Sequence, residues 1–175
     1  MHDDVLDAPQ LETVDAGAAL RAGDDRRRFG GGARLYGDAG LDVLAGAQVC
    51  VVGVGGVGSW AAEALARSGV GRITLIDADH VAESNVNRQV HALDSTLGAA
   101  KVDVMRARIV DIAPRCEVRV VDDFVTPENV GDLVPAGAFV VDAIDAPRAK
   151  AARVASAVRR RQLIVVCGAA GGRTD

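Results

Sequence analysis

The chain has 175 residues, of which 49% are apolar and 25% charged, and this balance excludes a protein dominated by intrinsic disorder. Its formal net charge of −4 does not indicate a general nucleic-acid binder, so a polyanion would have to meet local basic patches. The length fits one domain, and because only 3% of the residues are aromatic, we expect its core to be aliphatic.

Targeting and cysteine signals are weak in this sequence. Cys50, Cys116 and Cys167 form no Cys-x-x-Cys pair, which predicts reduced structural thiols and no zinc site. The acidic N-terminus is not followed by an apolar signal segment, and no run of 18 apolar residues occurs. We therefore expect a cytoplasmic protein.

The first part of the chain differs in character from the rest. Residues 1–25 have weak helical spacing, and we expect a poorly ordered arm there. Residues 26–37 are basic and rich in glycine, which predicts irregular structure up to a helix over 38–44. The basic run Arg26 to Arg28 and a second one, Arg159 to Arg161, are the patches that could meet RNA phosphates.

Short apolar runs and helical patterns then alternate along the chain. Continuous apolar runs are typical of parallel strands that are covered on both faces. They predict strands at 49–52, 73–77, 118–121, 139–142 and 163–166, and helices at 59–68, 101–112, 127–133 and 147–161. The alternation predicts an α/β fold of Rossmann-like type, with a mostly parallel sheet, helices on both faces and an N-terminal helical arm.

A glycine-rich segment, Gly53-Val54-Gly55-Gly56-Val57-Gly58, joins the first predicted strand to the helix that follows. Backbone N–H groups at such a helix start can bind a phosphate. Dehydrogenases, flavoproteins, methyltransferases and nucleotide activators share this pattern, so it leaves the nucleotide open, and a tight turn without a ligand is the structural alternative. The candidate binding residues are Gly53, Gly55, Gly56 and Gly58.

Asp77 ends the second predicted strand, where a carboxylate can accept hydrogen bonds from ribose hydroxyls. The alternative is a cap on the end of the strand. An acidic residue at this position favours an unphosphorylated ribose, and therefore NAD, FAD, an S-adenosyl cofactor or ATP over NADP.

Two cations follow on the same side of the predicted sheet. Arg88 and Lys101 suit a triphosphate, whose negative charge they could stabilise, better than a nicotinamide. Asn85 and Asn87 could contact the ribose or a phosphate oxygen, although asparagine is also common in turns. The alternative for Lys101 is an ordinary solvated lysine on a helix surface.

Asp142 and Asp145 lie at and just beyond the end of the fourth predicted strand. Strand topology brings them to the same carboxyl edge as Gly53 and Asp77. A carboxylate beside a triphosphate calls for a cation between them, so Asp145 is a candidate Mg²⁺ ligand. The alternative for Asp145 is a capping function before Pro147.

Together these segments resemble the ubiquitin-activating-enzyme-like adenylyltransferases, also called ThiF-type enzymes. The resemblance rests on Arg34-Leu35-Tyr36-Gly37, the glycine segment, Asp77-Ala78-Asp79, Ser84-Asn85-Val86-Asn87-Arg88-Gln89, Lys101 and Asp142-Ala143-Ile144-Asp145. Within that superfamily, Arg28-Phe29-Gly30-Gly31, the helix around Trp60, Asp122 to Asn129 and Gly168 to Gly172 resemble the tRNA threonylcarbamoyladenosine dehydratases.

The resemblance implies an ATP-binding domain over 26–175 that is incomplete at its C-terminus. It implies ATP and Mg²⁺ as cofactors, and a homodimer. Arg34 falls on the arginine that reaches a phosphate, from the neighbouring subunit in several relatives, and whether it acts within its own subunit or across the dimer is left open. The implied nucleotide-binding residues, besides the glycines, are Asp77, Asp79, Asn85, Arg88, Lys101 and Asp145. The implied catalytic residues are Arg34, Arg88, Lys101 and Asp145, and Asp145 is the implied metal ligand.

The implied activity is the ATP-dependent dehydration of N6-threonylcarbamoyladenosine at position 37 of tRNA. A substrate carboxylate attacks the α-phosphate, pyrophosphate leaves, and the ureido group of the substrate then closes a ring as AMP departs. Three alternatives remain open: an adenylyltransferase that activates the C-terminal glycine of a sulfur-carrier protein, an NAD-dependent oxidoreductase, and a nucleotide-binding protein without catalysis.

Overall fold

The computed structural model describes residues 27–145 and 147–167, which form one five-stranded parallel sheet with the strand order β3-β2-β1-β4-β5. The strands are β1 (Gln48–Val52), β2 (Arg72–Ile76), β3 (Glu117–Val121), β4 (Phe139–Asp142) and β5 (Ile164–Val166). The order reverses at β1, as in Rossmann-like sheets, and this confirms the predicted fold class. The arm predicted over 1–25 lies outside the described residues.

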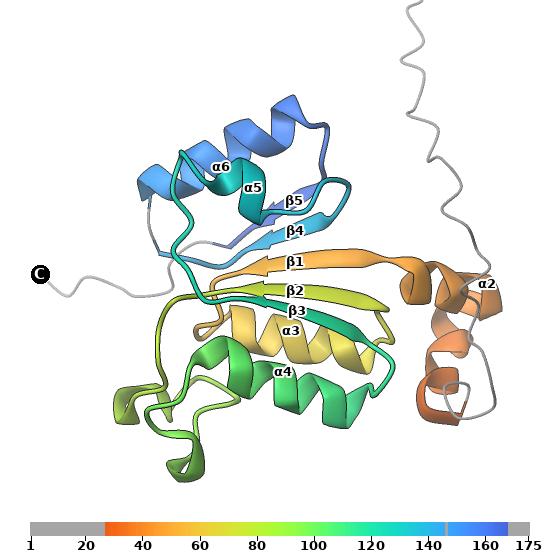
Figure 1. Ribbon diagram of the computed structural model, residues 1–175. Coiled ribbons are helices and arrows are strands. Elements are labelled where there is room, and N and C mark those ends of the chain that lie inside the picture. The colour runs from red at the N-terminus through yellow and green to blue at the C-terminus, as the bar shows by residue number, and fades with distance from the viewer. Residues whose placement is uncertain (1–26, 146, 168–175) are drawn as a thin grey trace, which may run out of the picture.

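Helices cover both faces of the sheet (Figure 1). One face carries α3 (Gly58–Arg67) and α4 (Lys101–Ile112), and the other carries α5 (Val130–Leu133) and α6 (Pro147–Arg159). The other described elements are α2 (Ala33–Gly46), which precedes β1, and three single turns, η2 (Gly30–Gly32), η3 (Glu83–Asn85) and η4 (Asp94–Thr96). Among these helices, none is long and apolar enough to cross a bilayer.

The core has one apolar cluster on each face. Val51, Leu75 and Met105 belong to the cluster under α3 and α4, and each of them is fully buried. Cys50 belongs to the cluster on the opposite face, where burial raises the pKa of its thiol to about 12. A thiol in that state is a packing group and not a nucleophile.

A buried carboxylate joins the two helices of the first face. Glu63 of α3 accepts hydrogen bonds from Arg108 of α4 and, at 2.9 Å, from Arg67 one turn along its own helix. The bonds from Arg108, with those from Arg67, hold the pKa of Glu63 below its usual range although burial acts against this. The network fixes α3, and with it the glycine segment at its start, against α4.

The glycine-rich segment before β1 is helical, so the irregular structure predicted over 26–37 is wrong. The turn η2 leads into α2 (Ala33–Gly46), which is kinked at Gly37, where φ is +70°. The predicted start of the helix at residue 38 therefore coincides with the second half of α2.

Two tertiary contacts outweigh the poor helix propensity of this segment. Phe29 packs against the first core cluster, and an added Cβ on Gly69 would lie 3.3 Å from its ring. Arg28 donates a hydrogen bond of 2.7 Å to the carbonyl of Ile112 at the end of α4. Such contacts are not visible in local composition.

The boundaries of two other helices differ from the prediction by two residues or more. The helix predicted over 127–133 starts only at Val130, because Thr126 and Asn129 bond each other's backbone N–H groups and form a turn before it. The helix predicted to reach residue 161 ends at Arg159, and Arg161 has a left-handed φ of +52°.

Candidate functional site

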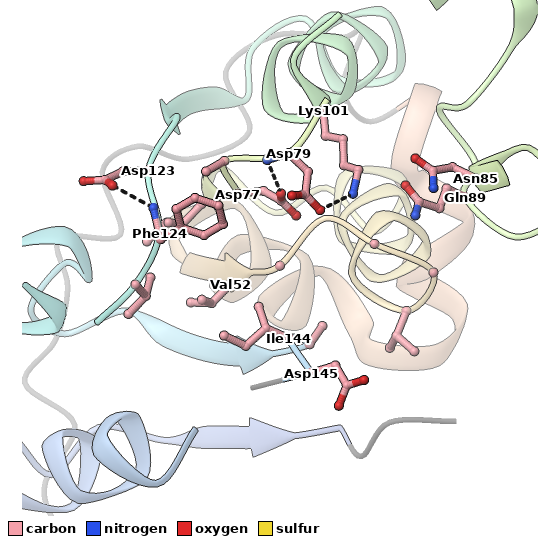
Figure 2. A pocket seen from close by; sticks show the side chains of 18 of the residues that line it. Val52, Asp77, Asp79, Asn85, Gln89, Lys101, Asp123, Phe124, Ile144 and Asp145 are labelled. Carbon is pink, nitrogen blue, oxygen red and sulfur yellow. Dashed lines mark hydrogen bonds and ion pairs between the residues drawn. The ribbon is translucent and has the colours of Figure 1, made fainter. Parts of the chain in front are cut away.

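A cleft of about 760 Å³ opens at the carboxyl ends of the central strands. Figure 2 shows its lining side chains. The cleft is lined by Val52, Gly53, Gly55, Gly56, Val57, Ile76, Asp77, Ala78, Asp79, Asn85, Arg88, Gln89, Lys101, Asp123, Phe124, Val125, Ala143, Ile144 and Asp145. Every candidate nucleotide-binding residue except Gly58 and Asn87 is among them, and the size suits a small-molecule ligand.

The glycines of the loop between β1 and α3 serve two different purposes. Gly53 has a φ of +88°, and a side chain on it would strike Ile144. A Cβ on Gly58 would collide with the carbonyl oxygen of Gly53. By contrast, a Cβ on Gly55 would come no closer than 4.0 Å to any neighbour, so that Gly55 leaves room for a ligand against the backbone.

Asp77 ties this loop to the end of β2. One carboxylate oxygen accepts a hydrogen bond of 2.6 Å from the N–H of Val54, and the other accepts one of 2.8 Å from the N–H of Asp79. Each oxygen retains a lone pair. Asp77 therefore combines the two interpretations of the sequence, because it caps the strand end and also faces the cleft.

Lys101 is not the solvated lysine of the alternative interpretation. Its side chain is only 6% exposed, and its ammonium group lies 2.7 Å from a carboxylate oxygen of Asp79 (Figure 2). The backbone joins the same two residues, since the N–H of Lys101 donates to the carbonyl of Asp79 at 3.0 Å. A cation buried at the start of α4 thus faces the cleft with one carboxylate partner.

Arg88 lies over the glycine loop, where an added Cβ on Gly56 would be 3.4 Å from its side chain. Its guanidinium donates to the carbonyl of Ser84 at 2.7 Å and to the side chain of Asn87 at 3.0 Å. Asn87 therefore supports Arg88 and does not line the cleft. Asn85 lines it, and its side-chain oxygen accepts a bond of 3.0 Å from the N–H of Ala82.

The aspartate at the end of the fourth strand and the one just beyond it lie in different surroundings. Asp145 is exposed and lines the cleft. Asp142 reaches the same edge of the sheet, but its side chain is completely buried beneath α6, where Arg153 donates two bonds of 2.7 and 2.9 Å to its carboxylate. Asp142 is therefore a structural residue.

Arg34 does not line the cleft of its own chain. It is exposed on α2, which runs directly into the amino end of β1, whereas the cleft lies at the carboxyl ends of the strands (Figure 1). If Arg34 contributes to such a site, it must therefore act at the cleft of another chain.

Among the cleft residues that were absent from the candidate set, three have contacts that bear on the site. Gln89 is 5% exposed and its amide lies beside Gly55, while its side-chain oxygen has no partner among the described residues. Phe124 is 66% exposed after β3, and its carbonyl accepts a bond of 2.8 Å from Asn129. Ile144 packs against Gly53. Two sequence signals could have found such residues: Gln89 directly follows Arg88, and Ile144 lies between Asp142 and Asp145.

In each of the two basic runs, one arginine donates hydrogen bonds to backbone carbonyls of the fold. Arg28 donates to carbonyls at the end of α4, and Arg160 donates to the carbonyls of Gly131 and Val134 around α5. Both guanidinium groups therefore stabilise helix ends. Within the described residues, no group of three or more His, Cys, Asp and Glu side chains could hold a metal ion.

Comparison with known proteins places this geometry in a family. Residues 31–175 match the model of the ThiF family. The tRNA threonylcarbamoyladenosine dehydratase of Escherichia coli is 56% identical over 151 residues, which are 86% of this chain and 56% of that protein. The enzyme of the same name from Bacillus subtilis is 48% identical over 140 residues, which cover 79% of this chain and 55% of the relative.

A solved structure agrees with these sequence matches. The crystal structure of the E. coli tRNA N6-threonylcarbamoyladenosine dehydratase in complex with ATP superposes with a TM-score of 0.83 at 55% identity, covering 87% of this chain and 64% of that one. The chain thus spans little more than half the length of the curated relatives.

Proposed function

The chain belongs to the ThiF family, and from that premise we propose that it binds ATP and dehydrates N6-threonylcarbamoyladenosine at position 37 of tRNA in the cytoplasm. The observation that carries the proposal is the buried Lys101, which faces the same cleft as Arg88 and the open glycine loop. Cations and free backbone N–H groups at a helix start suit the phosphates of a nucleotide.

The cleft offers a place for each part of ATP. The phosphates would lie against Gly55, where the structure leaves room for a ligand, and beside Gly56, over which Arg88 lies. Asp77 at the end of β2 would accept hydrogen bonds from the ribose hydroxyls. The exposed ring of Phe124 at the same edge of the cleft would stack on the base.

Positive charge would act where negative charge develops. Arg88 and Lys101 would stabilise the phosphates as the carboxylate of the substrate attacks the α-phosphate and pyrophosphate leaves. The ureido group of the substrate then closes the ring, and AMP departs. The net change is the loss of one water from the nucleoside as ATP becomes AMP and pyrophosphate.

Asp145 is the residue that would hold Mg²⁺. Its exposed carboxylate lines the cleft, and Mg²⁺ characteristically binds through one or two carboxylates together with water and phosphate oxygens. One protein ligand is therefore sufficient, and the ion would neutralise part of the phosphate charge. In isothermal calorimetry, Asp145→Asn should weaken the dependence of ATP binding on magnesium without abolishing the binding of adenosine.

A homodimer would bring Arg34 to the cleft of the neighbouring chain. The position of α2 at the opposite edge of the sheet supports this arrangement. Chains carrying Arg34→Ala and chains carrying Lys101→Ala should each be inactive, and mixing them should restore activity, because one of the two clefts in a mixed dimer has both residues. No recovery after verified subunit exchange would contradict the proposal.

The function is tested by incubating the chain with ATP, magnesium and tRNA that carries the modified adenosine. We expect the release of AMP and a tRNA fragment lighter by one water. A sulfur-carrier protein replaces tRNA in a parallel reaction, since other ThiF-type relatives include the molybdopterin-synthase adenylyltransferases. Pyrophosphate release with the carrier protein but not with tRNA would favour that alternative, and protection against unfolding by NAD but not by ATP would favour an oxidoreductase.

A further inference from the structure

The single tryptophan of the chain lies beside Arg88, a residue of the cleft. Trp60 belongs to the first turn of α3 and is 55% exposed. Its indole N–H donates a hydrogen bond of 3.0 Å to the carbonyl of Arg88, a residue that lines the cleft. The bond fixes the ring, while more than half of the residue stays accessible.

The exposed apolar rim consists of the indole and two valines, which lie close in the chain to Arg88 and to Trp60. Val57 precedes it by three residues, lines the cleft and is 42% exposed. Val86 lies two residues before Arg88 and is 47% exposed. Covering exposed apolar surface on binding is favourable, so a fixed aromatic ring flanked by exposed valines suits a partner with a flat apolar face.

The position of this rim says which partner it would meet. A substrate whose carboxylate attacks the α-phosphate must enter beside the phosphates, and Arg88, which holds the indole, lies at that end over Gly56. The proposed substrate presents its reacting group from an RNA, and the nucleotides that flank a reacting nucleoside carry flat bases. Proteins hold unpaired bases by stacking them on aromatic side chains.

We propose that Trp60, with Val57 and Val86, is a stacking platform for an unpaired nucleobase of the RNA substrate next to the reacting nucleoside. The inference rests on the proposed function and adds a binding surface to it. Trp60 is a positioning residue here: it holds the RNA while the cations of the cleft hold the nucleotide.

The lone tryptophan provides the measurement, since all indole fluorescence comes from Trp60. The full chain, saturated with a non-hydrolysable ATP analogue, is titrated with a single-stranded RNA hexamer and with an abasic backbone of the same length. We expect saturable quenching by the hexamer and little change with the abasic strand. Equal responses to both strands would overturn the proposal.

Variants provide a second readout. Trp60→Ala should weaken binding of the hexamer about 10-fold, equal to roughly 1.4 kcal/mol, whereas Trp60→Phe should retain most of the affinity. Phe139→Ala removes an exposed aromatic ring at the amino end of β4 and is the matched control, with unchanged RNA affinity expected.

The outcome separates the two proposals. If the wild-type chain dehydrates tRNA and Trp60→Ala does so with an unchanged KM for tRNA, the stacking platform is wrong and the proposed function stands. If the wild-type chain binds neither ATP nor tRNA, the proposed function itself fails. Thermal melting of each variant shows that a loss of binding is not a loss of folding.

Discussion

The two strands that flank β1 both lead into an aspartate, and the two carboxylates act differently. Asp142 and Ile76 occupy equivalent positions, since both pair in register with Val52, whereas Asp77 comes one residue later. Side chains alternate between the faces of a strand, so this offset of one residue separates them. Asp142 is buried under α6, and Asp77 faces the cleft.

The comparison shows that an acidic residue at a strand end is not by itself a ligand-binding residue. At the end of β4 the carboxylate serves folding, because Arg153 is 2% exposed and needs a counter-charge. At the end of β2 the carboxylate holds two backbone N–H groups and has lone pairs left for a ligand. Variants at the first end should change stability, and variants around the second should change binding.

The largest expected effect is at the end of β4. Asp142→Asn leaves the guanidinium of Arg153 buried without a full counter-charge, and removing one partner of a buried ion pair costs about 3–5 kcal/mol. Urea unfolding at pH 7 measures the loss. Asp145→Asn, three residues on and exposed, is the control and should unfold at the wild-type urea concentration. A loss below about 1 kcal/mol in Asp142→Asn would contradict this prediction. It would show that the ion pairs of Asp142 with Arg153 and with Lys150, which lies 3.5 Å from it, contribute little to stability.

The second effect concerns the cation at the cleft. Lys101→Met keeps the buried aliphatic stem but removes the charge, so ATP–pyrophosphate exchange should fall about 100-fold while the circular dichroism spectrum stays unchanged. Arg106→Met changes an exposed cation of the same helix and should exchange at the wild-type rate. A wild-type rate of ATP–pyrophosphate exchange in Lys101→Met would show that Lys101 does not contribute to the reaction.

The third effect is a pH dependence of folding. Burial, and then the positive charge of Lys101, lower the pKa of His91 to about 4, while Asp77 acts in the opposite direction and Arg108 adds to the lowering. The unfolded chain therefore binds a proton near pH 6.5 that the folded chain does not bind, and stability should fall by about 2 kcal/mol between pH 7 and pH 5.

His91→Gln should remove this component of the pH dependence. The measurement is the difference in unfolding free energy between wild type and variant at pH 7 and at pH 5. His80→Gln is the control, because His80 is exposed on the same loop. A wild-type pH dependence in His91→Gln would mean that other groups carry it.

The smallest effect tests Asp77 itself. Asp77→Asn should weaken the binding of ATP and of adenosine by the same factor, about 10-fold or roughly 1.4 kcal/mol, because the ribose is common to both ligands. Calorimetric titration with the two ligands measures this. Loss of ATP binding alone would place Asp77 at the phosphates, and a stability loss as large as that of Asp142→Asn would erase the difference between the two strand ends.

Local sequence patterns predicted the alternation of elements, and in α4 and β4 they predicted the bounds that the structure shows. They also predicted that one edge of the sheet would gather the glycine loop, Asp77 and Lys101. These features depend on periodicity and on the topology of parallel strands, both of which a single sequence contains.

The remaining features depend on contacts between distant segments. The burial of Asp142 follows from the register of β4 and from Arg153 on a later helix. The helical segment before β1 depends on Phe29 packing beside Gly69. None of these pairs is close enough in sequence for a local pattern to predict its geometry.

The segment from Asp79 to Lys101 is closed at its base by backbone bonds. The N–H of Val81 donates to Ala99 at 2.8 Å, and the N–H of Gly98 donates to Val81 at the same distance. Arg88 lies on the loop that this neck encloses, and Lys101 borders it. Local opening of the neck would therefore disturb both cations together, and a nucleotide that holds either one would slow amide exchange across the whole loop as a single cooperative unit.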